Sequence, residues 1–144
     1  MIRHVSGVAE IVEDVEDAVR FYRDVLGLDV QYEPGNGYAT IEVAGTLHFG
    51  VWSRRAATEN VVGDAGAAER IPLGFTLGFE VDSVAAAQQM IEAKGWHVAQ
   101  ALHTESWGQT TCRFFGPSGA LCEVAETPWA RRIVQPMQVE TQGD

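Results

Sequence analysis

The pattern of apolar positions predicts an amphipathic helix between Asp14 and Gly27. The apolar residues recur at three- and four-residue intervals and form one stripe, made of Val15, Ala18, Val19, Tyr22 and Leu26. Asp14 suits the N-cap and Gly27 suits a left-handed C-cap, so the helix has both a start and a stop signal. A β-branched strand precedes the helix and another begins at Leu28, which makes the unit strand–helix–strand.

The same unit occurs a second time between Val81 and Val98. Ser83 stands at the place of Asp14, Gly95 stands at the place of Gly27, and an alanine-rich helix lies between them. A repeat of this length indicates two similar modules that pack against each other.

Alternating apolar and polar positions predict the strands of each module. The expected strands are 5–12, 30–32, 38–43 and 46–52 in the first module and 75–81, 96–101, 110–115 and 120–125 in the second. Each module therefore has the order βαβββ.

One domain is expected over residues 1–126, with module one at 3–52 and module two at 74–126. The connection 53–73 contains charge, glycine and alanine but little periodicity, and we interpret it as a linker. Residues 127–144 are expected to form a short C-terminal helix and a loose tail.

The strand at 46–52 has one apolar face and one mixed face. The apolar face suits helix packing and consists of Leu47, Phe49 and Val51. His48 and Trp52 lie on the opposite face, and Glu123 lies in the middle of the last strand. We therefore expect an α+β fold, in which two tandem βαβββ modules form a cupped, partly closed mixed sheet around a cavity, with the helices outside.

Composition and charge narrow the class of protein. The chain has 144 residues, 46% of them apolar, which suits a soluble globular protein with a real core. The formal net charge of −10 argues against nucleic acid and anionic membranes as partners. The apolar runs are too short to span a bilayer and the N-terminus lacks a signal-peptide pattern, so a cytoplasmic location is expected. Cys112 and Cys122 fit no metal-finger spacing and are expected to be buried free thiols.

The chain resembles the vicinal oxygen chelate superfamily, which has the fold of glyoxalase I, extradiol dioxygenases and bleomycin-resistance proteins. The residues that carry the resemblance are Asp14-Val15, Phe21-Tyr22, Val25-Leu26-Gly27, Trp107-Gly108, Gly116-Pro117-Ser118-Gly119 and Glu123. The resemblance covers about residues 3 to 126, and it implies a fold rather than one reaction, because this fold hosts many activities.

The resemblance also implies four metal-ligand positions, one on each of four strands. They correspond here to Gly7, His48, Thr76 and Glu123, where Thr76 is placed by the offset that relates Asp14 to Ser83. Gly7 has no ligating side chain and Thr76 is a poor ligand, whereas a tight divalent site needs three or four protein ligands. His4 precedes Gly7 by three residues and is expected on the opposite face of the strand. We therefore expect no cofactor; a divalent metal on His48 and Glu123 is the alternative.

The function expected from these residues is that of a metal-free small-molecule binding protein, similar to the bleomycin-resistance branch, which sequesters a planar or aromatic compound. The candidate ligand-binding residues are His48, Trp52, Trp107, Glu123, Tyr38 and Arg113. The resemblance to that branch also implies a homodimer.

The alternative is an enzyme. One form is a divergent metal-dependent lyase, isomerase or dioxygenase that uses His48 and Glu123, and another uses either residue as a general base without a metal. A purely structural or partner-binding module is a third hypothesis, and the polar inner faces argue against it.

Overall fold

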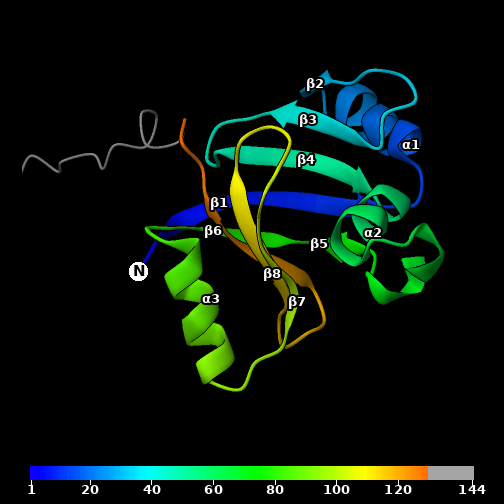
Figure 1. Cartoon of the computed structure of the whole chain (residues 1–144). Coiled ribbons are helices and arrows are strands. Elements are labelled where there is room, and N and C mark those ends of the chain that lie inside the picture. Colours follow the sequence, from blue (N-terminus) through cyan, green and yellow to red (C-terminus); the bar gives the residue numbers. More distant parts are fainter. Residues whose placement is uncertain (130–144) are drawn as a thin grey trace, which may run out of the picture.

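The protein is described over residues 1–129 of a computed structural model. Its strands form one mixed sheet (Figure 1). The main strands run in the order β2-β3-β4-β1-β6-β9-β8-β7, so the sheet is open, with β2 and β7 at its edges. Module one contributes β1 (Ile2–Val12), β2 (Asp29–Gln31), β3 (Tyr38–Glu42) and β4 (His48–Ser53). Module two contributes β6 (Leu77–Val81), β7 (Val98–Thr104), β8 (Thr110–Phe115) and β9 (Leu121–Glu126). The short strand β5 (Gly74–Phe75) pairs with β1.

The two modules meet at the centre of the sheet, where β1 and β6 run antiparallel. On the outer side of this pair, β4 runs parallel to β1 and β9 runs parallel to β6. The strand order is therefore the same when read outward from the centre in either direction. The expected α+β fold of two βαβββ modules is confirmed.

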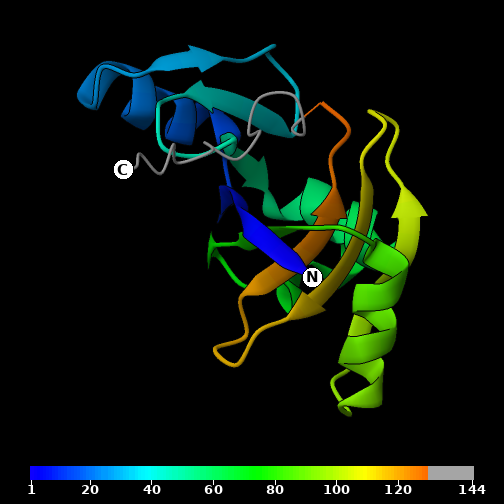
Figure 2. The ribbon, with the colours of Figure 1, turned by 90° about the vertical axis from the view of Figure 1, so that its left-hand side faces the viewer.

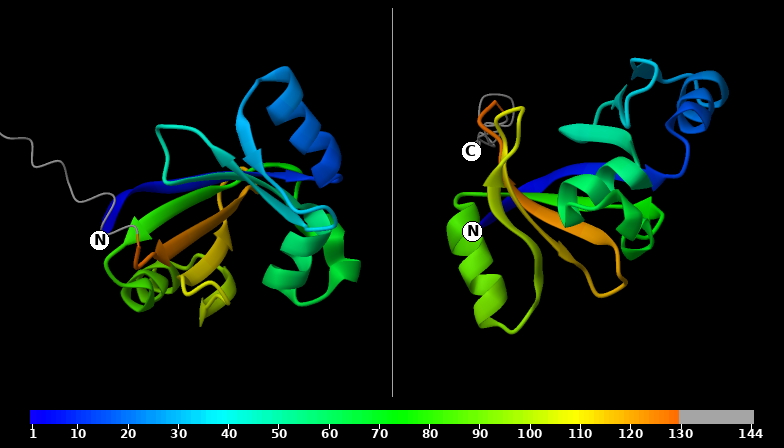
Figure 3. Two further views of the ribbon diagram at one scale, coloured as in Figure 1. Left: turned by 90° about the horizontal axis from the view of Figure 1, so that it is seen from above. Right: turned by 45° about the vertical axis from the view of Figure 1, so that its right-hand side comes forward.

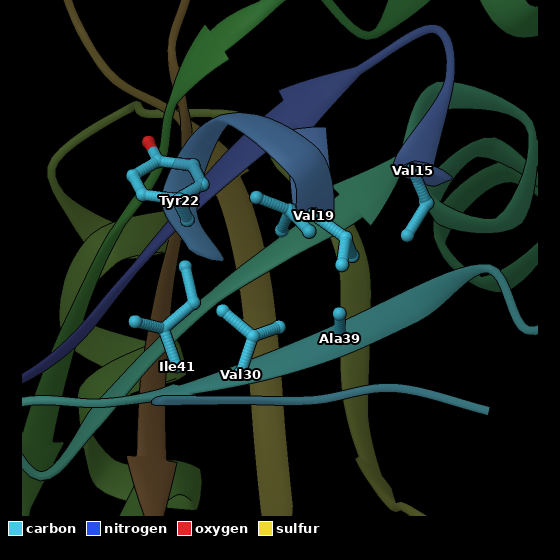
Figure 4. Close-up of a cluster of buried hydrophobic side chains, with 7 residues drawn as sticks. Val15, Val19, Tyr22, Val30, Ala39 and Ile41 are labelled. Atoms are coloured by element: carbon cyan, nitrogen blue, oxygen red, sulfur yellow. The ribbon is translucent and has the colours of Figure 1, made fainter. Parts of the chain in front are cut away.

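The first helix, α1 (Val15–Arg20), begins where the sequence predicts. The Asp14 carboxylate caps it by accepting hydrogen bonds from the backbone N–H groups of Glu16 and Asp17. The buried side of α1 packs on β2, β3 and β4 in a cluster formed by Val15, Val19, Tyr22, Val30, Ala39, Ile41 and Val51 (Figure 4). This cluster anchors the outer face of module one.

The expected apolar stripe does not continue to Leu26, whose side chain is 52% exposed. After α1 the chain forms a π-helical turn, η1 (Phe21–Val25), in which the Leu26 N–H bonds to the carbonyl of Phe21. A π turn closes over five residues rather than four, so it rotates the following side chains away from the stripe. Gly27 then ends the helix with a φ of 71°, as predicted.

The helix of module two, α3 (Val84–Ala93), is capped by the Ser83 hydroxyl, which accepts from the N–H of Ala86. Its residues Val84 and Ala87 pack against the outer face of β6, β8 and β9, in a cluster with Val81, Cys112 and Val124. Figure 2 shows α1 and α3 at opposite ends of the molecule. No helix among residues 1–129 is long and apolar enough to cross a membrane.

The connection between the modules is more ordered than expected. It forms a helix, α2 (Arg54–Val62), and a 3-10 segment, η2 (Ala65–Arg70). Two small apolar residues of α2, Ala57 and Val61, are buried with Ile11, Ile71 and Leu121. α2 contacts β1, β4 and β7, so it bridges the two halves of the sheet. Figure 3 shows α2 next to the end of β4 that leads into it. The sequence did not indicate this helix because its buried side is narrow and made of small residues.

The C-terminal prediction is only partly covered by the structure. Residues 127–129 form a turn after β9, and the expected helix and tail beyond them lie outside the described residues.

Candidate functional site

A cavity of about 550 Å³ lies on the face of the sheet opposite to α1 and α3. Both modules and α2 contribute to its wall. The lining residues include Ser6, Gly7, Tyr38, Thr40, His48, Trp52, Asn60, Thr76, Gly78, Trp107, Gln109, Arg113, Cys122 and Glu123. All six candidate ligand-binding residues are therefore brought together around one space, and their role in binding stays a prediction.

Four positions on four adjacent strands form the floor of the cavity. His48 on β4 is paired with Gly7 on β1, Gly7 is paired with Gly78 on β6, and Gly78 is paired with Glu123 on β9. The internal symmetry of the sheet relates Gly7 to Gly78 and His48 to Glu123. The two ionisable side chains, His48 and Glu123, therefore lie at the ends of the row, and the backbone of the two glycines lies between them.

The space around the two glycines restricts larger residues, strictly at Gly7 and less strictly at Gly78. A Cβ atom at Gly7 would lie 2.8 Å from the Cβ of His48, a distance that real Cβ atoms do not adopt. A Cβ atom at Gly78 would lie 3.2 Å from the Ser6 hydroxyl and 3.3 Å from Cγ of Glu123. His48 and Glu123 therefore lie close over the glycine backbone. A larger residue at Gly7 would displace His48, whereas a Cβ atom at Gly78 would require only a small shift of Ser6 or Glu123.

The register corrects two expectations for this row. Thr76 is not the counterpart of Gly7, because Gly78 pairs with Gly7 across the central strands. The Thr76 hydroxyl instead accepts a hydrogen bond of 3.1 Å from the N–H of Ala9. His4 is not on the face opposite to Gly7 either: a bulge in β1 inserts one extra residue, so His4 pairs with Glu80 and shares its face.

A divalent metal does not fit this row. The Nε2 atom of His48 is buried without a hydrogen-bond partner among the described residues, as a free ligand atom would be. However, the two central positions are glycines, so only His48 and Glu123 offer ligands. Within residues 1–129, no group of three or more His, Cys, Asp or Glu side chains is placed to hold a metal ion.

Arg113 on β8 lies behind Glu123 and is the centre of a buried polar network. Its side chain is 3% exposed. Nε donates to Oε1 of Glu123 at 3.2 Å, and Nη1 lies 2.8 Å from Oε1 of Glu105. Nη1 also contacts the side-chain oxygens of Asn60 at 2.9 Å and Gln100 at 2.8 Å. The charge of this guanidinium is therefore balanced by two carboxylates.

Aromatic rings form the wall beside this network. The guanidinium of Arg113 lies 5.4 Å from the centre of the Trp52 ring, which makes a cation–π contact. Tyr38 on β3 approaches Trp52 edge-on, with 6.4 Å between ring centres. Trp107 lies at the rim and is 51% exposed, and its Nε1 donates to Oε1 of Gln109 at 3.0 Å.

Sequence reasoning missed Glu105 and His103. Glu105 is 6% exposed and accepts hydrogen bonds from the hydroxyl of Thr111 and the amide of Asn60. The Nε2 atom of His103 lies 2.8 Å from Oε1 of Glu105. Asn60 comes from α2, so neither periodicity nor spacing could have indicated this group.

The network sets the protonation of its two carboxylates in opposite directions. Burial acts to raise the pKa of Glu105, but the charge and hydrogen bonds of Arg113 outweigh it and hold that pKa below its usual value. For Glu123, burial raises the pKa and the nearby Glu105 adds to the rise, while Arg113 and His48 oppose it. Burial, together with the charge of Glu123, also raises the pKa of Tyr38 to about 12.

The far end of the floor is covered by the turn after β9. Thr127 donates its backbone N–H to Oε2 of the buried Glu80 at 2.8 Å, and its hydroxyl accepts from Nε2 of Gln109 at 2.8 Å. The ring of Trp129 lies edge-on to His48, with 6.0 Å between the ring centres. The turn therefore limits access to His48 from this side.

Both cysteines are free. Cys112 is buried on the helix side of β8, and burial raises the pKa of its thiol to about 11. Cys122 is only half-buried and lines the cavity, so the expectation of two buried free thiols is right for Cys112 and wrong in burial for Cys122.

Comparison with known proteins identifies the fold family. A family model described as a glyoxalase-like domain matches residues 6–134. No curated protein matches the chain significantly.

Solved structures of the same fold align with most of the chain. A glyoxalase/bleomycin resistance protein/dioxygenase superfamily member from Vibrio splendidus has a TM-score of 0.58 and 19% identity, over 88% of this chain and 100% of that one. Methylmalonyl-CoA epimerase from Mycobacterium tuberculosis has a TM-score of 0.63 and 20% identity, over 91% of this chain and 93% of that one. A variant of the Streptomyces coelicolor epimerase, in complex with 2-nitronate-propionyl-CoA, has a TM-score of 0.60 and 17% identity, over 89% and 99%. These likenesses show a shared fold.

Proposed function

This chain belongs to the glyoxalase-like domain family, within the vicinal oxygen chelate superfamily, and we propose that it binds a planar or aromatic small molecule in the cavity between its modules. The single observation that supports this most is the combination of three aromatic side chains and a mostly apolar surface around a space of about 550 Å³. This volume is typical of small-molecule sites.

The proposed binding mode uses side chains that the structure already orients. Trp52 and Tyr38 offer one wall for a planar ring, and Trp107 offers a second contact at the rim. The orientation of Trp52 is held by Arg113 behind it. Glu123 and His48, at the two ends of the glycine floor, supply the polar contacts that fix the direction of the ligand.

In this proposal binding is metal-free. With ligands only from His48 and Glu123, a tightly bound divalent ion would lack the further protein ligands that such sites use. Recognition would instead rest on ring contacts and hydrogen bonds.

A second candidate function is proton transfer. The observation that favours it is the partly buried Glu123 carboxylate, with a raised pKa, at the edge of an apolar cavity. As a general base, Glu123 would take the proton from an acidic C–H of the substrate and return it at the end of the cycle. Epimerases share the fold of this chain, and this likeness supports the candidate only at the level of the fold.

Fluorescence quenching with a panel of planar aromatic compounds tests the binding proposal. Trp52→Ala should weaken the binding of any compound found by about tenfold or more, because it removes the ring wall. Trp96→Phe is the matched control, since Trp96 is 46% exposed and bonds to the carbonyl of Phe115 outside the cavity. Equal affinity in all three proteins, or no binding in the whole panel, would contradict the proposal.

The two candidate functions separate on Glu123→Gln. For a binding protein, this substitution should affect affinity less than Trp52→Ala does. For an enzyme, it should abolish turnover of any substrate found, because the amide cannot accept the proton.

Two further expectations complete the proposal. By resemblance to the bleomycin-resistance branch, the chain should form a homodimer in solution, which light scattering coupled to gel filtration would measure. Its location is expected to be cytoplasmic.

A further inference from the structure

The charges around the cavity point to the class of ligand, an inference that rests on the proposed function. We propose that the cavity selects planar ligands that carry a cationic N–H donor, such as an ammonium or amidinium group, over ligands that carry a carboxylate, with Glu123 as the acceptor.

The cation of the site, Arg113, is already neutralised by its neighbours. Arg113 is the only Arg or Lys among the described residues that line the cavity. Its guanidinium contacts the carboxylates of both Glu105 and Glu123. One positive charge against two carboxylates leaves no excess positive charge for an anionic ligand, which would have to displace a buried acidic partner.

The two carboxylate oxygens of Glu123 differ in their partners. Oε1 accepts from Nε of Arg113, and Oε2 accepts no hydrogen bond from a described residue. Oε2 lies 3.5 Å from the position that a Cβ atom at Gly78 would occupy, so it lies over the glycine floor. Because the side chain is 24% exposed, this oxygen is available to a ligand in the cavity.

The acceptor oxygen of Glu123 lies near the aromatic wall of the cavity. A ligand ring placed against Tyr38 and Trp52 would lie beside Glu123, since Arg113 contacts both the Trp52 ring and the Glu123 carboxylate. A cationic N–H on the ring would form a charge-assisted hydrogen bond with Oε2. The net charge of −10 adds long-range attraction for cations.

Three probes with the same ring test this inference: 2-naphthylmethylammonium, 2-naphthalenemethanol and 2-naphthoate. Their affinities for the full chain are measured by tryptophan fluorescence at pH 7. We expect the ammonium probe to bind about tenfold or more tighter than the naphthoate, with the alcohol between them.

Glu123→Gln tests whether this carboxylate causes the preference. The substitution should reduce the ratio of ammonium to naphthoate affinity to about threefold or less and should leave the alcohol nearly unaffected. Glu42→Gln, at an exposed position of β3, changes the net charge equally and should leave the ratio intact. Glu123→Asp, which keeps the charge, should retain part of the preference if Glu123→Gln does not fold.

The outcomes separate this inference from the proposed function. If all three probes bind equally, or if the naphthoate binds most tightly, the charge preference is wrong while aromatic binding stands. If the ratio is unchanged in Glu123→Gln, the assignment of the acceptor is wrong. If none of the three probes binds, the proposed function itself fails.

Discussion

Arg113 and Glu123 are direct cross-strand partners on β8 and β9, and their side chains form an ion pair with Nε and Oε1 3.2 Å apart. The two residues differ in exposure: the Arg113 side chain is 3% exposed, whereas that of Glu123 is 24% exposed. Of the two lining residues, Arg113 is therefore almost enclosed, whereas Glu123 is more open to the cavity. The pair joins the acid of the candidate site to a buried network that includes Glu105 and, through Asn60, the bridging helix α2.

Replacing Arg113 should reduce the stability of the fold more than replacing a residue of an exposed ion pair does. Arg113→Gln leaves the buried Glu105 without its cation, so we expect the free energy of unfolding to fall by about 3 kcal/mol. Urea unfolding followed by circular dichroism measures this change. Arg3→Gln is the control, since Arg3 pairs with Asp82 at the surface and should contribute about 1 kcal/mol or less. A similar small loss for both variants would contradict the structural role of Arg113.

The lowered pKa of Glu105 predicts a specific dependence of stability on pH. A carboxyl group with a folded-state pKa below its unfolded value, about 4.3, binds fewer protons when folded. Its contribution to stability is therefore complete above pH 4.3 and is lost as the pH falls through the folded-state pKa. The difference in unfolding free energy between the wild type and Glu105→Gln should be largest near pH 7 and shrink in acid. A difference that stays constant from pH 7 to pH 3 would show that the charge of Glu105 is not involved.

The glycine floor predicts that a single methyl group is enough to disturb the site. Gly7→Ala would place a Cβ atom 2.8 Å from that of His48, so His48 must move or the strands must separate. We expect a loss of stability of about 1–3 kcal/mol and weaker binding of any cavity ligand. Thermal unfolding and ligand titration of the variant measure both effects. Thr76→Ala is the comparison, because it introduces no steric clash and removes only the hydrogen bond from the N–H of Ala9. An unchanged Gly7→Ala protein would mean that the floor is not close-packed.

The row of His48, two glycines and Glu123 predicts weak affinity for divalent metals. Protein purified without chelator and then incubated with nickel, zinc, manganese or iron(II) should lose the ion on dialysis, because two ligands do not form a tight site. Elemental mass spectrometry measures the retained metal. Close to one ion per chain would overturn the proposal of metal-free binding and make His48 and Glu123 ligands.

The sequence by itself determined the local features of this protein. The caps at Asp14 and Ser83, the two module helices and the faces of β4 all follow from residues near each other in the chain. Such features are set by short-range periodicity and hydrogen bonding, so they can be predicted from one sequence. The repeat of these features also indicated the duplicated fold and its cavity.

Only the tertiary structure decided which residues meet inside that cavity. The bulge in β1 places His4 beside Glu80 and makes Gly78 the partner of Gly7. Nothing in the local sequence of β1 indicates this shift of register. Asn60 and Arg113 are separated by 53 positions and meet because α2 folds back over module two. Strand register and helix docking depend on contacts between distant segments, and these contacts, rather than local patterns, surround the candidate site with a buried charge network.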